Sequence, residues 1–208
     1  MIKTVVKAML AGISISFGSI VYLSLENHVV GAVLFLVGLF TIYVFDYYLF
    51  TGKVCYIVNK PLSYLWFCLQ IFAGNILGAM SMGYMVRGTK LAKLIDVVTV
   101  VVDKKLSDTL YSSFMMGILC GFLIGIAILG YATIKDEIGR YIALFLPIIV
   151  FILSGYEHCI ANAFYFSFAN AWSGTTVIYL VVVALGNTIG GMFIPFFARI
   201  IDGKKLGV

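Results

Sequence analysis

Residues 154–162, SGYEHCIAN, interrupt an apolar segment that runs from Tyr141 to Ala171 and is long enough to cross a lipid bilayer. A helix that breaks at membrane depth frees backbone N–H and C=O groups, which must line a cavity or find other partners. Glu157 and His158 place two ionisable side chains at the same point, and such groups are costly inside a membrane unless they have a structural or functional reason. The stretch therefore predicts a broken helix within a membrane-spanning bundle.

A second interruption, DYYLFTGK at residues 46–53, ends an earlier apolar segment. It also mixes glycine, small polar and ionisable residues into apolar surroundings. Thr51 precedes Asn75 by almost the same distance along the chain as Asn162 precedes Asn187. We therefore expect Thr51 and Asn162 to be equivalent positions in two halves of the chain. Paired interruptions at corresponding positions indicate a transport site between the halves.

Two further segments resemble each other, GNILGAM at 74–80 and GNTIGGM at 186–192, and they are separated by close to half the length of the chain. Each lies in the third predicted span of its half, so we expect the halves to have opposite orientations and to form an inverted repeat with a site near the midplane. Small residues spaced four apart also allow helices to pack closely in lipid. We expect one transmembrane domain, residues 1–208, with a first repeat at about 1–103 and a second at about 104–208.

The composition is that of a membrane protein. Of the 208 residues, 62% are apolar and 11% are charged, and the mean hydropathy is +1.10. A soluble domain has about a quarter of its residues charged, and no soluble core of this size could bury so much apolar surface. The lysines and arginines cluster between apolar segments and at the chain ends, which is typical of loops that flank membrane spans and not of nucleic-acid binding.

Six spans are expected, with the second and fifth broken, so the predicted fold class is an all-α integral membrane bundle. The spans cover about residues 4–25, 29–50, 62–85, 110–134, 141–156 with a continuation at 161–171, and 175–197. Residues 87–108 are expected to form a polar connection with a short apolar island at 97–102. The first span is expected to be retained, because a removed signal peptide would leave an odd number of helices.

Charge in the short connections predicts the orientation. With six spans both termini share one side, which carries nine lysines and arginines against five on the other. The nine are Lys3, Lys7, Lys53, Lys60, Lys135, Arg140, Arg199, Lys204 and Lys205. The five are Arg87, Lys90, Lys93, Lys104 and Lys105, all in one connection. We therefore expect a multi-pass protein of the cell membrane with both termini in the cytoplasm.

The polar residues of the interruptions allow more than one interpretation. His158 is either a proton-exchanging group beside the transport path, since histidine titrates near neutrality, or a neutral ring hydrogen-bonded to Thr51 or to a backbone carbonyl. Its position in one of two matched breaks favours the functional interpretation. Glu157 is expected to bond freed backbone N–H groups or to point to a neighbour. Thr51 either donates a hydrogen bond into a pore or caps the break.

Metal binding and catalysis are not expected. The four cysteines lack paired spacing and are expected to fill apolar positions. The two histidines, His28 and His158, lie in different halves of the chain, whereas a zinc site needs two or more ligands at helical spacing. No set of nucleophile, base and orienting group can be assembled from the intramembrane residues, so we predict neither an enzyme nor a cofactor.

Four motifs resemble those of the formate/nitrite transporter family. They are LFTG at 49–52 in the broken second helix, GILC at 117–120 in the fourth, GYEHCIAN at 155–162 in the fifth and GNTIGG at 186–191 in the sixth. The resemblance covers nearly the whole chain. It implies a homopentamer of aquaporin-like protomers, each with its own pore, for substrates that include formate, nitrite, hydrosulfide, acetate and lactate.

The resemblance also implies roles for individual residues. His158 would be the central pore residue, Thr51 its partner across the channel, and Asn187 a further residue lining the centre. Lys105 would draw anions into the outer vestibule. The two apolar constrictions would be formed by Phe35, Leu39, Phe50, Ile124 and Phe151. The residues assigned to the structure of the helix breaks are Gly52, Glu157 and Asn162.

The chain departs from the family pattern at three points. The residue after Cys120 is usually asparagine and is Gly121 here, which removes a polar group near the centre and favours a substrate that needs fewer hydrogen bonds, such as hydrosulfide. Asp46 is an unusual charge close to the broken second helix. The chain is also short for the family at its termini and between the fifth and sixth spans, so we expect no gating of the pore by its termini.

The predicted function is a channel or transporter for small monovalent weak-acid anions, formate first, with hydrosulfide or nitrite as alternatives within the family. An anion in an apolar constriction is far more costly than its neutral acid, so a weak acid can be attracted as an anion, protonated and passed as a neutral molecule. We expect His158 to supply or sense the proton. A water or neutral-solute channel is the alternative of another class, and the basic connection and the intramembrane histidine favour an anion.

Overall fold

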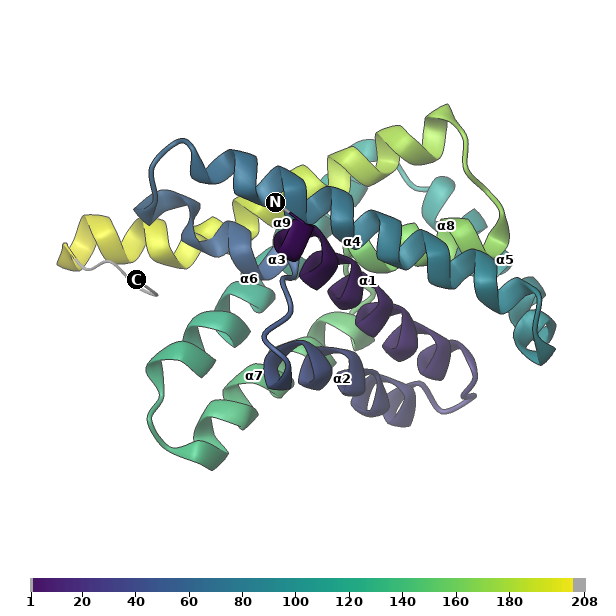
Figure 1. The fold of residues 1–208 in the computed structure, drawn as a ribbon, viewed down its shortest axis with the longest axis horizontal. Helices are drawn as coiled ribbons and strands as arrows, with labels where there is room; N and C mark the ends of the chain where they lie inside the picture. The colour runs from purple at the N-terminus through teal and green to yellow at the C-terminus, as the bar shows by residue number, and fades with distance from the viewer. Residues whose placement is uncertain (1, 204–208) are drawn as a thin grey trace.

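A computed structural model describes residues 2–203, and over that range the chain is all-helical. The helices are α1 (Ile2–Leu23), α2 (His28–Val44), α3 (Phe50–Lys53), the 3-10 helix η1 (Val54–Asn59), α4 (Tyr64–Arg87), the 3-10 helix η2 (Lys90–Leu94), α5 (Ile95–Leu106), α6 (Leu110–Thr133), α7 (Glu137–Leu153), α8 (Cys159–Ala169) and α9 (Gly174–Asp202). Helices α2 and α7 contact each other along the lower edge of Figure 1, and α4 and α9 cross its upper part. Two residues of the predicted charge asymmetry, Lys204 and Lys205, lie outside the described residues.

Within residues 2–203, four helices, α1, α4, α6 and α9, are long and apolar enough to cross a membrane. They correspond to the predicted first, third, fourth and sixth spans. The segments predicted as the second and fifth spans are each divided into two helices: α2 and α7 have 17 residues each, and α3 and α8 follow them after short non-helical links. The predicted second span was expected to continue to Phe50, but its helix ends at Val44. The predicted polar connection at 87–108 is itself mostly helical, since it contains η2 and α5.

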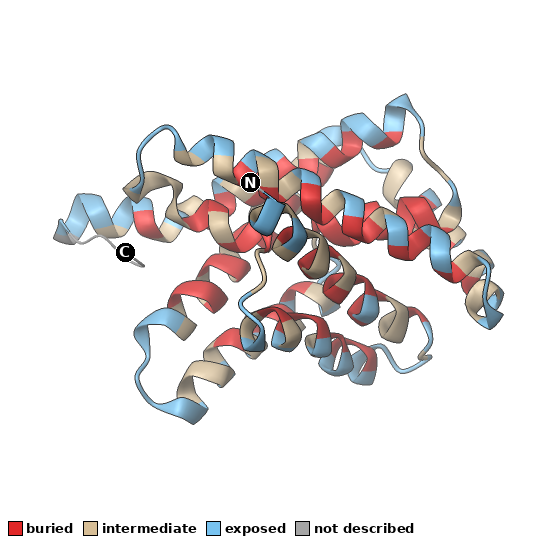
Figure 2. Cartoon of the chain, viewed as in Figure 1, coloured by how far each residue is buried: buried red, intermediate tan, exposed pale blue. Residues whose placement is uncertain are grey.

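The outer faces of the helices carry large apolar side chains. Figure 2 shows buried residues concentrated where helices meet and exposed residues along their outer sides. Leu34 and Phe40 of α2, Leu146 of α7 and Phe193 of α9 are all exposed, at 45% to 57% of their surface. An apolar surface of this extent needs a lipid or protein environment.

Helices α2 and α7 end in the same way. The N–H of Tyr47 reaches back to a carbonyl of α2 at 2.9 Å, and the N–H of Tyr156 does the same in α7 at 3.0 Å. The residues before these donors, Asp46 and Gly155, have φ of 51° and 69°. A left-handed residue followed by a bond back to the last turn is the Schellman end of a helix. Asp46 therefore fills a backbone position that the second half fills with glycine, and aspartate is one of the few L-residues that tolerate it.

Asn75 of α4 holds the first break together. Its Oδ1 accepts a hydrogen bond from the N–H of Phe50 at 2.7 Å. Its Nδ2 donates to the carbonyls of Ala8 and Tyr48 at 2.7 and 2.8 Å. Because Asn75 is fully buried, these bonds satisfy backbone groups that no water reaches.

Asn187 of α9 makes the same three bonds at the second break. Its Oδ1 accepts from the N–H of Cys159 at 3.0 Å. Its Nδ2 donates to the carbonyls of Gly117 and Glu157, both at 2.8 Å. All three partners follow their counterparts in the first half by one constant offset along the sequence. The two segments matched by sequence, 74–80 and 186–192, therefore make equivalent contacts.

These bonds correct the predicted register between the two breaks. With the constant offset of the asparagine bonds, Leu49 corresponds to His158 and Thr51 corresponds to Ile160. Leu49 and His158 are indeed the N-cap residues of α3 and α8. The predicted equivalence of Thr51 with Asn162 is wrong, because Asn162 lies two positions beyond the true counterpart.

Glycines bring the long helices together at equivalent points. A Cβ added to Gly12 would overlap the Asn75 carbonyl, and a Cβ added to Gly121 would overlap the Asn187 carbonyl. Position 121 thus faces the backbone of α9, and the chain needs glycine there for α6 and α9 to approach. A side chain at this position would not fit between the helices as they lie here, so Gly121 has a packing role, and its effect on the polarity of the pore centre stays a prediction.

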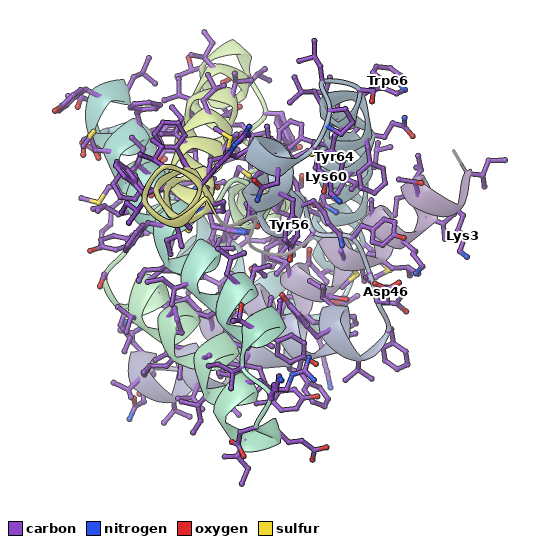
Figure 3. The ribbon with its side chains drawn as sticks, turned by 90° about the vertical axis from the view of Figure 1, so that its left-hand side faces the viewer. Lys3, Asp46, Tyr56, Lys60, Tyr64 and Trp66 are labelled. Atoms are coloured by element: carbon purple, nitrogen blue, oxygen red, sulfur yellow. The ribbon has the colours of Figure 1, made fainter. Side chains whose placement is uncertain are left out.

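Both ends of the described chain lie at the same end of the bundle. The Tyr48 N–H donates to the Lys7 carbonyl at 3.3 Å, which places the start of α1 against the first break. Arg199 donates to the Val58 carbonyl at 2.8 Å, which places the end of α9 against η1. We call this the terminal end. Figure 3 views the molecule from the left-hand side of Figure 1 and labels Lys3, Asp46 and Lys60 of this region.

Candidate permeation site

Two cavities reach the helix breaks. The larger, about 470 Å³, is lined by Lys105, Glu157 and His158 among others, and we call it the Lys105 cavity. The smaller, about 120 Å³, is lined by Leu49, Gly52 and Lys53 among others, and we call it the Lys53 cavity. The predicted site residues that line the Lys105 cavity are Phe35, Lys105, Phe151, Glu157, His158 and Asn162. Those that line the Lys53 cavity are Leu39 and Gly52.

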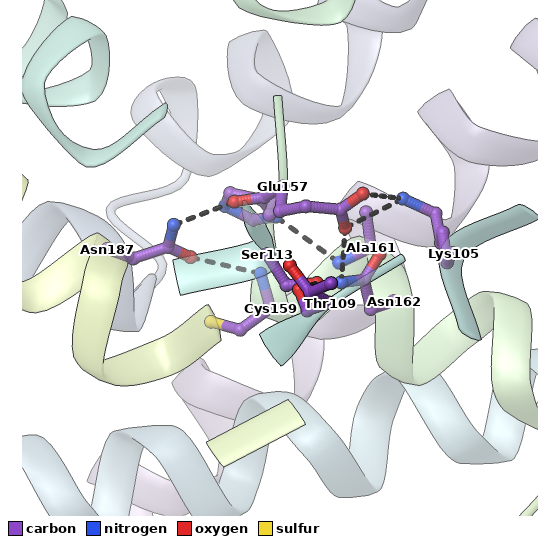
Figure 4. Close-up of polar contacts among 9 residues, drawn as sticks. Lys105, Thr109, Ser113, Glu157, Cys159, Ala161, Asn162 and Asn187 are labelled. Carbon is purple, nitrogen blue, oxygen red and sulfur yellow. Dashed lines mark hydrogen bonds and ion pairs between the residues drawn. The ribbon is translucent and has the colours of Figure 1, made fainter. Parts of the chain in front are cut away.

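A buried polar network occupies one wall of the Lys105 cavity (Figure 4). Lys105 Nζ donates to both carboxylate oxygens of Glu157, at 2.8 and 2.7 Å. Asn162 Nδ2 donates to the same carboxylate at 2.8 Å. Glu157 thus points to neighbouring side chains, the second of its two expected roles, and the freed backbone groups are bonded by Asn187 instead. The ion pair leaves the wall polar but close to neutral.

Helix α5 places Lys105 in this wall. Val98 and Val102 are buried, and Lys105 follows them on the same helical face at helical spacing. Helix α5 packs against α8, which begins directly after His158. The lysine at the end of this face therefore reaches the second break.

Thr51 and His158 bring the two breaks into contact. Thr51 Oγ1 lies 3.1 Å from His158 Nε2, and both residues are buried. His158 lines the Lys105 cavity, whereas the neighbours of Thr51, Gly52 and Lys53, line the Lys53 cavity. The contact of Thr51 with His158 therefore lies between the linings of the two cavities.

The second ring nitrogen of His158 defines its tautomer. The N–H of Ala161 donates to His158 Nδ1 at 3.2 Å, as in a helix N-cap. An Nδ1 that accepts a hydrogen bond carries no proton, so the neutral ring is protonated at Nε2 and donates to Thr51 Oγ1. The Thr51 hydroxyl proton is then left to point elsewhere. Of the two expectations for Thr51, capping of the break is not observed, since the α3 N-cap has no side-chain bond.

Apolar side chains close the space between the cavities. Phe35 lines the Lys105 cavity, and Leu39, one turn further along α2, lines the Lys53 cavity. Four residues of helix rise by about 6 Å, so the two linings come close together along α2. Phe151 stacks beside the His158 ring, with 5.9 Å between centroids. The other two predicted constriction residues, Phe50 and Ile124, are buried in the core and line neither cavity.

Comparison with known proteins decides the family. The model of the formate/nitrite transporter family matches residues 1–201. The chain belongs to the formate/nitrite transporter family. Membership confirms the resemblance seen in the motifs, and the family and the matched proteins are transporters and channels, not enzymes.

Individual relatives agree with the family assignment. The formate channel FocB of Escherichia coli is 27% identical over 184 residues, which cover 79% of this chain and 65% of FocB. The formate channel BtFdhC of Bacillus thuringiensis is 28% identical over 192 residues, which cover 84% of this chain and 73% of the relative. The chain therefore spans just under two thirds of FocB.

A solved structure has the same fold. A pentameric formate channel with formate bound superposes with a TM-score of 0.82 at 22% identity and covers 97% of both chains. The all-helical fold is thus that of the formate/nitrite channel structures.

The family resemblance implied that Asn187 lines the pore centre, but Asn187 lines neither cavity. Its three side-chain bonds all go to backbone groups of the second break, and it is fully buried outside both cavity linings. It holds the segment that carries Glu157 and His158. Gly52 lines the Lys53 cavity, where a Cβ would press on Ile128 at 3.3 Å.

Several residues of the Lys105 cavity were not identified from the sequence. Tyr22 and His28 flank the link between α1 and α2, with ring centroids 5.5 Å apart, and both line the cavity. Tyr165 lines it one turn after Ala161 on α8. The helical spacing of positions 158, 161, 162 and 165 could have identified Tyr165, whereas no local signal identifies Tyr22 and His28. Within residues 2–203, no three histidine, cysteine or acidic side chains gather as a metal site would require.

Proposed function

We propose that the chain is a channel for small monovalent weak-acid anions, with formate as the first substrate and nitrite or hydrosulfide as alternatives. The observation that carries the proposal is the contact of Thr51 with His158 between two cavities. It supplies a polar pair in an apolar barrier. Relatives described as formate channels and a neighbour with formate bound support the choice of formate.

The barrier favours a neutral acid over its anion. Moving an unpaired charge into an apolar constriction is far more costly than moving the neutral acid. The Lys105 cavity holds the anion beside a lysine before it takes up a proton. Asn162 Oδ1 is buried and has no hydrogen-bond partner among the described residues, so it can accept a hydrogen bond from water or from the protonated acid.

His158 acts in this proposal as a hydrogen-bond donor to the passing acid. Its Nε2–H turns from Thr51 to an oxygen or sulfur of the substrate, and the Thr51 hydroxyl donates a second bond. A second proton on the ring would have to sit on Nδ1, opposite the N–H of Ala161. The geometry therefore supports a proton that travels with the substrate, in preference to one stored on the ring.

The same proposal includes the predicted topology and assembly. Six spans in a 3+3 inverted repeat, aquaporin-like, with repeats at about 1–103 and 104–208, are supported by the equivalent bonds of Asn75 and Asn187. The shared end of α1 and α9 supports termini on one side, and the charge asymmetry supports the cytoplasmic side of the cell membrane. The pentameric neighbour supports a homopentamer.

Flux measurements in proteoliposomes test the function. We expect formate, nitrite or hydrosulfide to enter far faster than into empty liposomes, and uptake to increase as the pH falls and more of the acid is neutral. Swelling with glycerol in the absence of anion flux would instead indicate a neutral-solute channel. The ranking of the three anions identifies the substrate.

Variants at position 158 test the proposed role of the histidine. His158→Phe removes the donor nitrogen at the barrier, and we expect anion flux to fall at least about tenfold, the equivalent of one lost buried hydrogen bond. His158→Asn keeps an N-capping acceptor and an N–H donor on a side chain that cannot titrate, so it should retain more flux and the same pH profile. Unchanged flux in His158→Phe contradicts the role.

A further inference from the structure

The two cavities are built from equivalent positions of the two halves. With the constant offset defined by the asparagine bonds, Lys53 corresponds to Asn162 and Tyr56 corresponds to Tyr165. The first member of each pair lines the Lys53 cavity and the second lines the Lys105 cavity. The Lys53 cavity is thus the counterpart of the Lys105 cavity at the terminal end, with a lysine where the other has an amide.

The charges of the two cavities are balanced differently. In the Lys105 cavity, Lys105 is bonded to both oxygens of Glu157, so its charge is neutralised within the wall. At the Lys53 cavity the carboxylate of Asp46 pairs with Lys7 of α1. Lys53 takes part in no ion pair among residues 2–203. A half-buried cation in a cavity wall thus has no carboxylate at ion-pair distance among the described residues, and Asp46, its acidic neighbour, is bonded to Lys7.

Lys7 and Lys53 both lie next to the ring of Tyr48. The ammonium groups of Lys7 and Lys53 each lie 4.9 Å from the ring centroid of Tyr48. Tyr48 is anchored by its N–H to the Lys7 carbonyl and by its carbonyl to Asn75. The carbonyl of Lys53 accepts from the Tyr64 hydroxyl at 3.2 Å. These anchors hold two cations around one aromatic ring, and the side chain of their acidic neighbour, Asp46, is 72% exposed.

We infer that the Lys53 cavity is a second anion-binding site, at the terminal end of the pore, with Lys53 as its charged contact and Lys7 and Tyr56 beside it. The inference rests on the proposed function. The cavity of about 120 Å³ has room for a small monovalent anion together with water. The site raises the local anion concentration at the end of the pore opposite Lys105.

A basic terminal end is also expected from membrane topology alone. Lys60 provides the matched comparison, because it lies at the same end, is exposed and does not line the cavity (Figure 3). If only topology placed these lysines, Lys53 and Lys60 would be interchangeable in transport. If Lys53 binds the anion, substitution of Lys53, and not of Lys60, changes the half-saturating anion concentration for transport from the terminal end.

The experiment measures radiolabelled formate flux in membrane vesicles of both orientations, so that each end of the pore faces the loading solution in turn. We expect Lys53→Gln to raise the half-saturating formate concentration from the terminal end by about threefold or more, with a smaller change from the other end. Lys60→Gln should match the unaltered protein. Asp46→Asn tolerates the left-handed backbone and removes the competing carboxylate, so it should lower the half-saturating concentration from the terminal end.

The outcomes separate this inference from the proposed function. If the unaltered protein passes no anion, the proposed function fails. If it passes formate but Lys53→Gln saturates like Lys60→Gln, the second site is overturned and the function stands. An Asp46→Asn protein that saturates no earlier than the unaltered one also overturns the site, and this variant remains informative if Lys53→Gln does not fold.

Discussion

Asp46 and Gly155 occupy the same backbone position in two equivalent helix ends, and both have positive φ. The two halves therefore have the same backbone conformation at this point, whereas their side chains differ. Asp46 pairs with Lys7 of α1, and Gly155 lines the Lys105 cavity. The unusual charge at residue 46 has a structural reason, because aspartate tolerates the left-handed region that the end of α2 requires.

Substitution of Asp46 should separate its backbone role from its charge. We expect Asp46→Gly to unfold at about the same temperature as the unaltered protein, because the ion pair it loses is largely exposed. Asp46→Val forces a β-branched residue into the left-handed region and should cost more than about 1 kcal/mol. Thermal unfolding in detergent measures both. Equal stability of the two variants would contradict the backbone role.

Much of the fold follows from hydropathy. Helices α1, α4, α6 and α9 have at least 22 residues each and are predicted to within a few residues, because nothing interrupts their apolar pattern. The breaks are predicted from their polar residues. Their register was predicted incorrectly because Thr51 and Asn162 were matched by distance from the asparagines. The true register depends on which backbone N–H and C=O groups the two asparagines bond, and the sequence does not report this.

The site could be predicted only in part. His158 and Thr51 stand out because they are polar in apolar surroundings, and their contact was among the expected alternatives. The pairing of Lys105 with Glu157 joins positions far apart in the sequence and depends on how α5 packs on α8, which no local pattern reports. The packing role of Gly121 depends on the approach of α9, which the comparison with the family motif alone does not report.

Loss of either asparagine should weaken the fold by a similar amount. Asn75→Ala and Asn187→Ala each leave one N–H and two carbonyls without their partner, and a buried unsatisfied group costs about 1–3 kcal/mol. Because the two residues bond to different partners, the double variant should lose the sum of the two single effects. Thr188→Val, next to Asn187, removes only a bond within its own helix and should change little. A loss for Asn187→Ala no larger than for Thr188→Val would contradict the role in holding the break.

The Lys105–Glu157 pair should control anion entry from the Lys105 cavity. Lys105→Gln leaves a buried carboxylate that repels anions, so we expect flux at low formate concentration to fall by about tenfold. Glu157→Gln leaves the lysine free for the anion and should lower the half-saturating concentration. The double variant should lie between the two, because it restores neutrality.

Lys104→Gln, which removes a charge from the same cavity lining, serves as the control. Shifts in the same direction for both single variants would show that the pair serves only the fold.

Substitution of Gly121 tests the packing of α6 against α9. A Cβ at this position would overlap the Asn187 carbonyl, and a backbone atom in the middle of a helix cannot move aside as a flexible side chain can. We expect Gly121→Ala to lower the unfolding temperature strongly, with a cost above about 3 kcal/mol, and Gly121→Asn to do so at least as much. Gly174→Ala is the matched control, because no described atom lies within 4 Å of a Cβ there.

If position 121 instead served substrate choice, Gly121→Asn would fold normally and change the ranking of formate against hydrosulfide. A well-folded Gly121→Asn protein would therefore contradict the packing role, and the order of the two anions in flux would then show what the family asparagine does.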